Sequence, residues 1–484
     1  MGPQPRSREP FFKATVFILT FLIYMSMHSA RKCISVVKNA EAFLDCEAHL
    51  NVSSITEEEG KCSSWFTEMD GKQEAEAKTW LGFIDTSFLV SYSVFMFCSG
   101  VVAERMNLRY FLVIGLMMSS ILTIMLGFSY TFEIHSIWYL LVIQVVNGLF
   151  HSTAWPGIVA AMGNWFGKGQ RGLIMGIWNS HTSIGNIVGS SIAGAFVTFN
   201  WGLSFIVPGI LLGVVGVLNF LGLIPHPSNI GIPPPSESEE SPKEKEAKKT
   251  PVEEDNASAI GFIGALKIPG VVEFALCLFF AKLVSYTFLY WLPNYIHSTA
   301  NVDASSAAFL STIFDYGGIL GGILAGIVTD KTGMSATTSS VMLLIAIPLM
   351  FIYQTLVDSW CPLDTDPYSE PIINSCYNWN AVLLFTTGLF VNGPYSLITT
   401  AVSAELGQHP SLQGSKNALA TVSAIIDGTG SAGAAIGPLI AGPLSSNDHW
   451  ENVFYMLMAA DVLALCLLVR LVKNEITRKT QRRK

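Results

Sequence analysis

The chain has 484 residues, of which 50% are hydrophobic and only 13% are charged, and its formal net charge is −8. An average soluble protein carries roughly 25% charged residues, so this composition excludes an ordinary soluble domain. The acidic residues gather in two hydrophilic segments, 41–76 and 237–255, and no basic surface is indicated, so we expect no nucleic-acid partner.

The first apolar block, 11–27, approaches the ~20 residues that a helix needs to cross a bilayer. It lacks the cleavage site of a signal peptide and is followed by Arg31 and Lys32, so we interpret it as a spanning helix. Similar blocks recur along the chain and predict an all-α membrane protein embedded in the lipid bilayer. Twelve transmembrane helices are predicted, at 12–33, 81–103, 110–129, 137–162, 172–198, 203–223, 265–295, 305–329, 338–357, 380–402, 416–442 and 451–472.

The loop after the first span has features of an oxidising, non-cytosolic compartment. Asn51 begins an Asn-Val-Ser triplet, a predicted glycosylation acceptor. Cys46 and Cys62 share this loop, and Cys361 and Cys376 share the loop before the tenth span. Each pair is predicted to form a disulfide, and four free thiols are the alternative.

An even number of crossings places both termini on the same side of the membrane. Lys and Arg are distributed unevenly between the two sides. Most of them fall in turns on the side of the N-terminus. The other side keeps Lys38 and three further lysines, all in the acid-rich first loop. The positive-inside rule therefore predicts that both termini are cytosolic.

Between the sixth and seventh spans, a Pro-rich start leads into a run of Ser, Glu and Lys that is too charged to bury apolar surface. This run predicts a flexible linker between two halves of six spans each. The predicted organisation is an N-terminal half at 1–225 with an external loop at about 34–80, a disordered cytosolic linker at 226–262, a C-terminal half at 263–472 and a basic cytosolic tail at 473–484.

A short motif recurs in the turn between the second and third helices of each half. It reads Gly-Val-Val-Ala-Glu104-Arg105 in the first half and Gly-Ile-Val-Thr-Asp330-Lys331 in the second. This order of glycine, acid and base resembles the loop motif of the major facilitator superfamily. The resemblance implies charge contacts that favour one conformation, so these two acids and two bases are candidate ion-pair or gating residues.

Three cations lie within predicted spans, Arg31 and Lys32 near the end of the first and Lys282 inside the seventh. A cation in the bilayer costs ~2.5–3.5 kcal/mol on insertion scales, so such residues usually face a cavity. We expect these cations to meet between the halves, with Asp315 of the eighth span as the partner of one lysine. If that lysine is Lys32, Arg31 and Lys282 are left as uncompensated cations. Arg31 and Lys282 would then bind a phosphate dianion. Snorkelling at the helix end and a structural ion pair are the alternatives.

Several segments resemble the organophosphate:phosphate antiporters of the major facilitator superfamily, and most closely the sugar phosphate exchangers of solute carrier family 37. They are 24–35, 154–156, 178–183, 280–286 and 425–430. The likeness covers nearly all the chain except the first loop, the linker and the tail. It implies antiport of a small phosphorylated anion, glucose 6-phosphate or a related ester, against inorganic phosphate across the endoplasmic reticulum membrane.

The resemblance also implies roles for single residues. The family's phosphate-binding arginine falls on Arg31, its neighbouring lysine on Lys32, the acid that pairs with this lysine on Asp315, and an aromatic residue of the same helix on Tyr24. The full set of predicted substrate-binding residues is Tyr24, His28, Arg31, Lys32, Asn179, His181, Lys282 and Tyr286.

Two positions depart from the bacterial antiporters. Their seventh-helix cation would fall on Ser285, and Lys282 lies three residues earlier, about one helical turn away on a similar face. Their substrate histidine would fall on Thr182, with His181 one place off. A buried structural histidine is the alternative for His181.

The sequence contains no metal-ligand cluster, nucleophile constellation or cofactor motif in a fitting context, so we expect neither an enzyme nor a cofactor. Two other functions stay open. One is a proton-coupled organic anion transporter of the same fold, indicated by Asp85, Glu273 and Asp427 in or near spans. The other is a transport-inactive membrane scaffold. No oligomeric state follows from the sequence.

Overall fold

The computed structural model describes residues 8–38, 74–134, 136–166, 171–232, 262–300, 302–360, 370–407, 419–445 and 449–483. Every regular element in these ranges is a helix, and no strand occurs in them. The predictions on Asn51 and on the two cysteine pairs fall on residues or side chains outside this description.

The N-terminal half contains six helical passes. The first three are α1 (Glu9–Val37), α3 (Glu74–Arg105) and α4 (Leu108–Thr131). The fourth is divided into α5 (Ile137–His151) and α6 (Ala154–Trp165), and the last two are α7 (Arg171–Phe196) and α8 (Leu203–Gly222). Asn107 caps α4, because its side chain accepts a hydrogen bond from the backbone N–H of Arg109.

The C-terminal half repeats this plan. A short helix, α11 (Phe262–Leu266), precedes α12 (Val271–Ala300), α13 (Ala304–Thr332) and α14 (Ser335–Trp360). The fourth pass is α15 (Glu370–Leu397), which continues through a π-helical turn, η4 (Ile398–Val402), into α16 (Ser403–Leu406). The last two passes are α17 (Leu419–Leu444) and α18 (Trp450–Arg483).

Eleven stretches of the described chain are long and apolar enough to cross a membrane. They match all the predicted spans except the fifth, which corresponds to α7. This helix of 26 residues packs among the others, and the polar run Asn179–Ser183 lowers its hydropathy. The eleven stretches and α7 together give the predicted fold of twelve transmembrane helices in two six-helix halves, which is confirmed.

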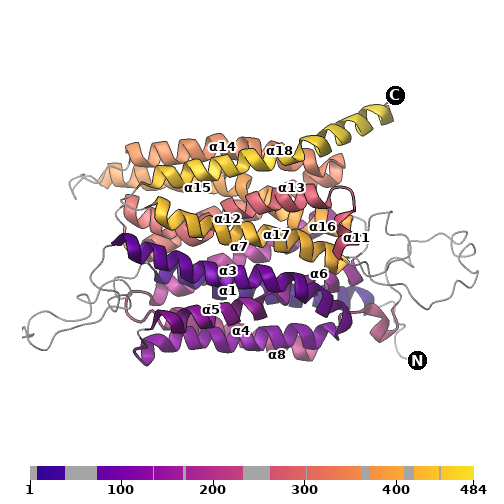
Figure 1. The fold of residues 1–484 in the computed structure, drawn as a ribbon, viewed down its shortest axis with the longest axis horizontal. Coiled ribbons are helices and arrows are strands. Elements are labelled where there is room, and N and C mark those ends of the chain that lie inside the picture. Colours follow the sequence, from indigo (N-terminus) through magenta and orange to yellow (C-terminus); the bar gives the residue numbers. More distant parts are fainter. Residues whose placement is uncertain are drawn as a thin grey trace, which may run out of the picture.

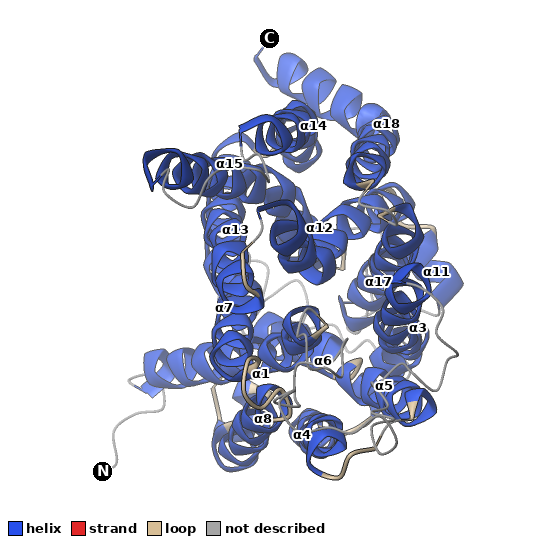
Figure 2. Cartoon of the chain, turned by 90° about the vertical axis from the view of Figure 1, so that its left-hand side faces the viewer, coloured by secondary structure: helices blue, strands red, loops and turns tan. Residues whose placement is uncertain are grey.

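The two halves stand side by side with their helices roughly parallel (Figure 1). Seen along the helices, α1 to α8 form one group and α12 to α18 the other (Figure 2). The halves meet where α7 packs against α13 and where α3 packs against α17. These two contacts enclose α1 and α12, which face each other at the centre.

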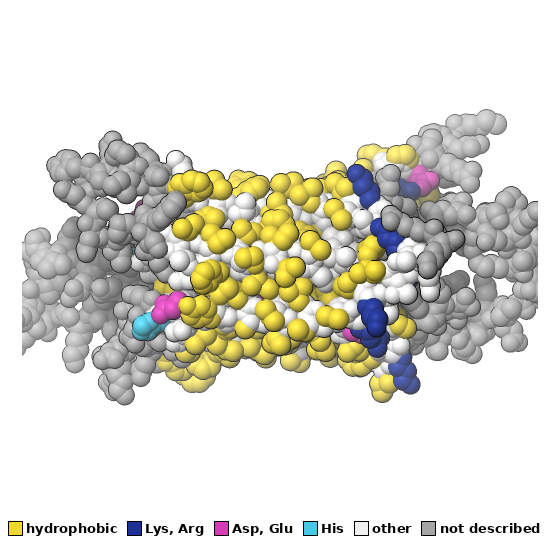
Figure 3. All heavy atoms as spheres, turned by 90° about the horizontal axis from the view of Figure 1, so that it is seen from above, with side chains coloured by type: hydrophobic (Ala, Val, Ile, Leu, Met, Phe, Trp, Pro, Cys, Tyr) yellow, Lys and Arg dark blue, Asp and Glu magenta, His cyan; other side chains and the backbone are white. Residues whose placement is uncertain are grey.

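The surface of the bundle fits a lipid environment. Hydrophobic side chains cover the middle of the face in Figure 3, and Lys and Arg side chains gather at one end of it. This is the end at which α18 ends in Figure 1, and below we call it the terminal end. The other end is called the opposite end.

Gly185 and Gly189 allow α7 to pack closely against α1. A Cβ atom on Gly185 would lie 2.7 Å from the Cβ of His28, and one on Gly189 would lie 3.0 Å from the Cβ of Lys32. Backbone oxygens of α1 would be nearer still. Small residues four positions apart are a common device for close helix contact in membranes. Here they bring the polar face of α7 against the charged part of α1.

Three predicted boundaries differ from the structure. The seventh span begins as α12 at Val271, because Gly270, with a φ of +97°, breaks the chain direction after α11. The predicted tail at 473–484 is helical as far as Arg483, because α18 continues through it. In the predicted linker, Pro227–Ile230 forms a short 3₁₀ helix, η3, and 233–261 lies outside the described residues. The remaining domain division stays a prediction.

Candidate functional site

A cavity lies between the two halves, where α1 and α7 meet α12, α13 and α15. Its volume is about 20 Å³, which is room for about one water molecule. A larger ligand can therefore enter only when the halves move apart. The polar side chains on its wall are His28, Lys32, Thr182, Ser183, Asn186, Ser285, Tyr286, Ser311, Asp315, Asn392 and Tyr395.

Lys32 and Asp315 both reach this cavity, but they do not form the predicted ion pair. The Nζ of Lys32 donates to the backbone oxygen of Leu289 at 2.6 Å. The Oδ1 of Asp315 accepts a hydrogen bond from the Nδ2 of Asn186 at 2.8 Å. Because α7 places an amide next to the carboxylate, Asn186 takes the position expected for the lysine.

The guanidinium of Arg31 lies beside the cavity rather than on its wall. Its Nη1 donates to the Oη of Tyr286 at 3.0 Å. The rings of Tyr24, Phe88, Tyr92 and Tyr286 surround its Cζ at 5.3 to 5.9 Å. Its Nε and Nη2 are buried and have no hydrogen-bond partner among the described residues. The guanidinium therefore has two donors without a partner in the described structure, which is what the predicted anion site requires.

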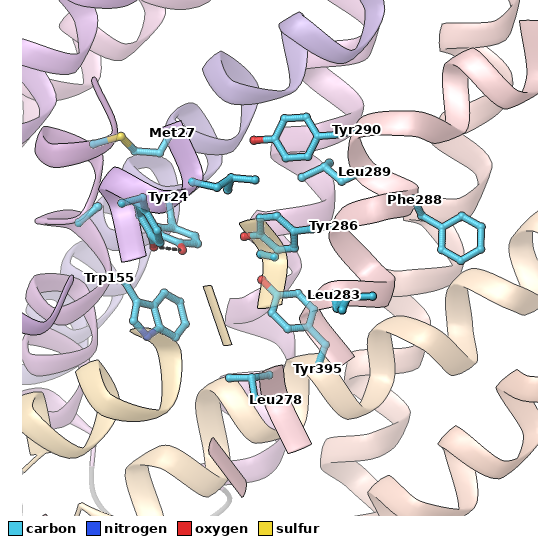
Figure 4. Packing of buried hydrophobic residues seen from close by; sticks show 14 of the residues in the cluster. Tyr24, Met27, Trp155, Leu278, Leu283, Tyr286, Phe288, Leu289, Tyr290 and Tyr395 are labelled. Atoms are coloured by element: carbon cyan, nitrogen blue, oxygen red, sulfur yellow. Dashed lines mark hydrogen bonds between the residues drawn. The ribbon is translucent and has the colours of Figure 1, made fainter. Parts of the chain in front are cut away.

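The aromatic rings around Arg31 come from both halves. Tyr286, Tyr290 and Tyr395 point from the C-terminal half toward Tyr24, whereas Phe288 points away from them (Figure 4). The bond between Arg31 and Tyr286 joins α1 to α12. It must therefore break or stretch when the halves separate on that side.

Lys282 is buried in α12 as predicted, but it has an ionic partner. Its Nζ lies 2.6 Å from the Oδ1 of Asp427 and 3.3 Å from the Oγ of Ser431, both in α17. An unpaired charge in such a position would cost several kcal/mol, which accounts for the pairing. The expectation that Lys282 and Arg31 are two uncompensated cations is therefore wrong for this conformation.

A second buried ion pair was not predicted. Lys38, expected in the first loop, is the C-cap of α1, and its Nζ lies 2.6 Å from the Oδ2 of Asp85 in α3. The same Nζ lies 4.2 Å from the ring centroid of Trp291 in α12, a cation–π contact between the halves. The basic Arg31-Lys32 pair suggested a helix end, but α1 continues through Val37. The contact between Lys38 and Trp291 closes the space between the halves toward the opposite end.

The predicted substrate contacts His181, Asn179 and Tyr24 do not lie on the cavity wall. His181 is fully buried, with its ring 4.9 Å from that of Tyr24, while its neighbour Thr182 lines the cavity. This position favours the structural alternative for His181. Asn179 donates to the Oγ of Ser396 in α15 at 2.8 Å, a bond between the halves.

The repeated motif supplies another contact between the halves. The Oδ2 of Asp330, at the end of α13, accepts a hydrogen bond from the backbone N–H of Leu173 at the start of α7, at 2.7 Å. Lys331 and Arg105 are exposed, and the side chain of Glu104 lies outside the description. The contact made by Asp330 closes the cavity toward the terminal end, and its gating role stays a prediction.

The buried charged side chains of α1, α3, α12, α13 and α17 include one more cation than acids, and a further buried acid, Asp461, lies in α18. Lys38 and Lys282 have their own carboxylates, and Lys32 shares the cavity with Asp315. The excess therefore belongs to Arg31. The four cations and three acids are Arg31, Lys32, Lys38 and Lys282 and Asp85, Asp315 and Asp427.

Three neutral wall residues, Asn186, Ser285 and Asn392, were not predicted as site residues. A neutral side chain carries no large cost of insertion into the bilayer, so it cannot be told from a residue that only packs. For Asn186 the polarity of α7 was the available signal. The described residues contain no group of three or more His, Cys, Asp or Glu side chains that could hold a metal ion.

Known proteins resemble this chain over nearly its full length. The family model described as the Major Facilitator Superfamily matches residues 74–422. The glucose-6-phosphate exchanger SLC37A2 of Xenopus laevis is 48% identical, over 98% of this chain and 95% of that protein. The protein of the same name from Homo sapiens is 48% identical, over 97% and 94%. The glucose-6-phosphate exchanger SLC37A1 of Homo sapiens is 44% identical, over 97% and 95%.

A solved structure shares the fold at low sequence identity. It is a crystal structure of a bacterial homolog to the human lysosomal transporter Spinster, in an inward-facing and unoccupied conformation. The TM-score is 0.62 at 17% identity, with 96% of this chain and 98% of that chain covered. This likeness supports the twelve-helix architecture and carries no argument about substrate.

Proposed function

Because this chain belongs to the major facilitator superfamily and, within it, to the family of the glucose-6-phosphate exchangers, we propose that it is an antiporter that exchanges a sugar phosphate for inorganic phosphate by alternating access. Glucose 6-phosphate is the first candidate among the esters. The family predicted from the sequence is confirmed. The observation that carries the proposal is Arg31, a buried guanidinium with two idle donors and no acidic partner in the described structure.

Arg31 and Lys32 are the proposed phosphate ligands. A guanidinium offers a planar fork that matches two phosphate oxygens, and an ammonium adds a point charge. Lys32 now donates to a backbone oxygen, and Arg31 donates to Tyr286. Both contacts are neutral, so an anion that enters between the halves offers each cation a stronger, charge-assisted partner.

The contacts between the halves fall into two sets, as alternating access requires. Toward the terminal end, Asp330 binds α7 and Asn179 binds Ser396. Toward the opposite end, Lys32 binds the backbone of α12 and Lys38 lies over Trp291. Opening one set while the other stays closed would expose the cavity to one side at a time.

The excess positive charge favours exchange over net flux. Closing the halves over an uncompensated guanidinium costs several kcal/mol, and a bound anion removes most of this cost. We therefore expect the carrier to reorient mainly with an anion in place. Inorganic phosphate is the proposed counter-substrate, because Arg31 and Lys32 recognise the phosphoryl group that both anions share.

We further propose that both termini are cytosolic and that the protein resides in the endoplasmic reticulum membrane. The Lys and Arg side chains at the terminal end (Figure 3) support the orientation by the positive-inside rule. The organelle follows only from the resemblance noted in the sequence. Transport without an enzymatic step is the expected activity.

Proton-coupled transport is the second candidate, and the ion pairs disfavour it. It was indicated by three acids in or near spans. Asp85 and Asp427 each have a lysine partner at 2.6 Å, and Glu273 lies 2.6 Å from Arg470. A proton taken up by Asp85 or Asp427 would leave its buried lysine partner as an uncompensated cation, which costs several kcal/mol.

A counterflow panel with purified protein in proteoliposomes tests the proposal. Uptake of labelled phosphate is measured with internal glucose 6-phosphate, glycerol 3-phosphate, phosphate or no anion, each with and without a pH gradient. We expect uptake with internal phosphate esters and little effect of the gradient. Uptake driven by the gradient without internal anion would favour proton coupling, and no flux under any condition would favour the scaffold.

A further inference from the structure

A chain of hydrogen bonds crosses the cavity wall from one half to the other. The Nδ1 of His28 in α1 lies 3.0 Å from the Oδ1 of Asn186 in α7. The Nδ2 of Asn186 donates to the Oδ1 of Asp315 in α13 at 2.8 Å. All three side chains are buried and line the cavity. We call this chain the polar bridge.

The chemistry of its members fixes the direction of every bond in the polar bridge. A carboxylate only accepts, so the amide nitrogen of Asn186 must face Asp315 and the amide oxygen must face His28. An amide oxygen also only accepts, so the Nδ1 of His28 carries the proton and donates. In the neutral imidazole, the Nε2 atom is then an acceptor.

The Nε2 atom of His28 has no hydrogen-bond partner in the described structure, although it is buried. A second proton there would add an unsatisfied donor and a third cation close to Arg31 and Lys32. The neutral tautomer is therefore favoured. The ring is held in place by Tyr24, whose ring centroid lies 4.9 Å away. His28, which lines the cavity, thus has an unused acceptor on a ring that is held in a fixed orientation.

His28 precedes Arg31 and Lys32 by three and four residues on the same helix, about one turn of 5.4 Å. Resting on the proposed function, we propose that the Nε2 atom of His28 accepts a hydrogen bond from a hydroxyl group of the sugar phosphate, with Asn186 as the positioning residue. The polar bridge then distinguishes a polyol phosphate ester from inorganic phosphate. A phosphate bound at Arg31 and Lys32 is too short to extend one helical turn, whereas a sugar carries hydroxyl groups at that distance.

The polar bridge also makes recognition of the hydroxyl group depend on closure of the two halves. Asp315 belongs to the C-terminal half, and His28 and Asn186 belong to the N-terminal half. The amide of Asn186 is oriented by Asp315 only when α7 and α13 are together. The acceptor is therefore correctly presented when the halves close around the ester.

The test compares two Michaelis constants in proteoliposomes, one for glucose 6-phosphate and one for phosphate, each measured against internal phosphate. For His28→Ala and Asn186→Ala we expect the ratio of the ester constant to the phosphate constant to rise about tenfold, the loss of one well-placed hydrogen bond. The double variant should show no further rise, because both changes remove the same contact. His28→Gln, whose amide oxygen can reach the Nε2 position, should recover part of the selectivity.

His151→Ala is the matched control. His151 is also buried, and its Nδ1 lies 3.0 Å from the Oδ1 of Asn147, but it does not line the cavity. This variant should leave the ratio unchanged. If the His28 variants fold poorly, monodeoxy glucose 6-phosphates can be tested on the unmodified protein, where removal of one hydroxyl should raise the constant about tenfold.

The outcomes separate this inference from the proposed function. An unchanged ratio in folded His28→Ala protein, or equal constants for all monodeoxy esters, overturns the role of the polar bridge while phosphate exchange stands. Absence of exchange by the unmodified protein overturns the proposed function itself.

Discussion

Lys282 and Asp427 form a buried ion pair, with 2.6 Å between Nζ and Oδ1, that joins α12 to α17 within the C-terminal half. Removing one partner leaves an uncompensated buried charge, which typically destabilises a protein by about 3–5 kcal/mol. We therefore expect Lys282→Met to lower the melting temperature and the yield of monodisperse protein in detergent. The double variant Lys282→Met/Asp427→Leu should recover most of both. A single variant as stable as the unmodified protein would show that the pair is not formed.

Arg31 carries the excess charge of the site, so its substitution should act on transport rather than folding. Loss of a charge-assisted contact in a poorly solvated site costs about 2–5 kcal/mol, so Arg31→Ala should lower exchange at least about 30-fold. Arg31→Lys should also transport poorly, because an ammonium lacks the planar fork. Exchange rates are normalised to folded protein measured by size-exclusion chromatography. Near-normal exchange by folded Arg31→Ala would remove this residue from the site.

The packing of α7 on α1 gives a prediction about glycine. An added Cβ on Gly185 would lie 2.7 Å from the Cβ of His28, so Gly185→Ala should push the helices apart and lower both melting temperature and exchange. Overpacking of this kind typically costs about 1–3 kcal/mol. Gly82→Ala is the control, because its nearest contact would be an ordinary 3.6 Å. Equal effects of the two substitutions would contradict the proposed helix contact.

The first loop allows the orientation to be tested. If this loop is not cytosolic, Asn51 carries a glycan, and treatment with a glycosidase should increase the gel mobility of protein from secretory-competent cells. Asn51→Gln should show the same increase without treatment. A mobility that neither change alters would count against the assigned side or the use of this site.

The fold was predictable because bilayer thickness imposes a length on every apolar segment. The prediction was less accurate where a charged residue lies inside a helix. Lys38 was placed in a loop because charge usually ends a span, whereas its pairing with Asp85 allows α1 to continue. The polar helix α7 was still predicted, as the span 172–198.

The candidate site was predictable only in its charged members. Arg31, Lys32, Lys282 and Asp315 stood out because a charge in the bilayer is costly. Which cation pairs with which acid depends on side-chain directions across helices that are far apart in the sequence. The structure therefore pairs Lys282 with Asp427 and gives Asp315 an amide partner. For the neutral Asn186 the polarity of α7 was the available signal, and it does not single out one residue.

Obligatory exchange is the central claim, and one measurement tests it most directly. Labelled phosphate uptake is compared in proteoliposomes that contain glucose 6-phosphate and in identical proteoliposomes that contain no anion. Because an unfilled site would have to close over the charge of Arg31, we expect uptake at least about tenfold faster with the internal ester. Equal uptake in the two preparations would contradict exchange through this site.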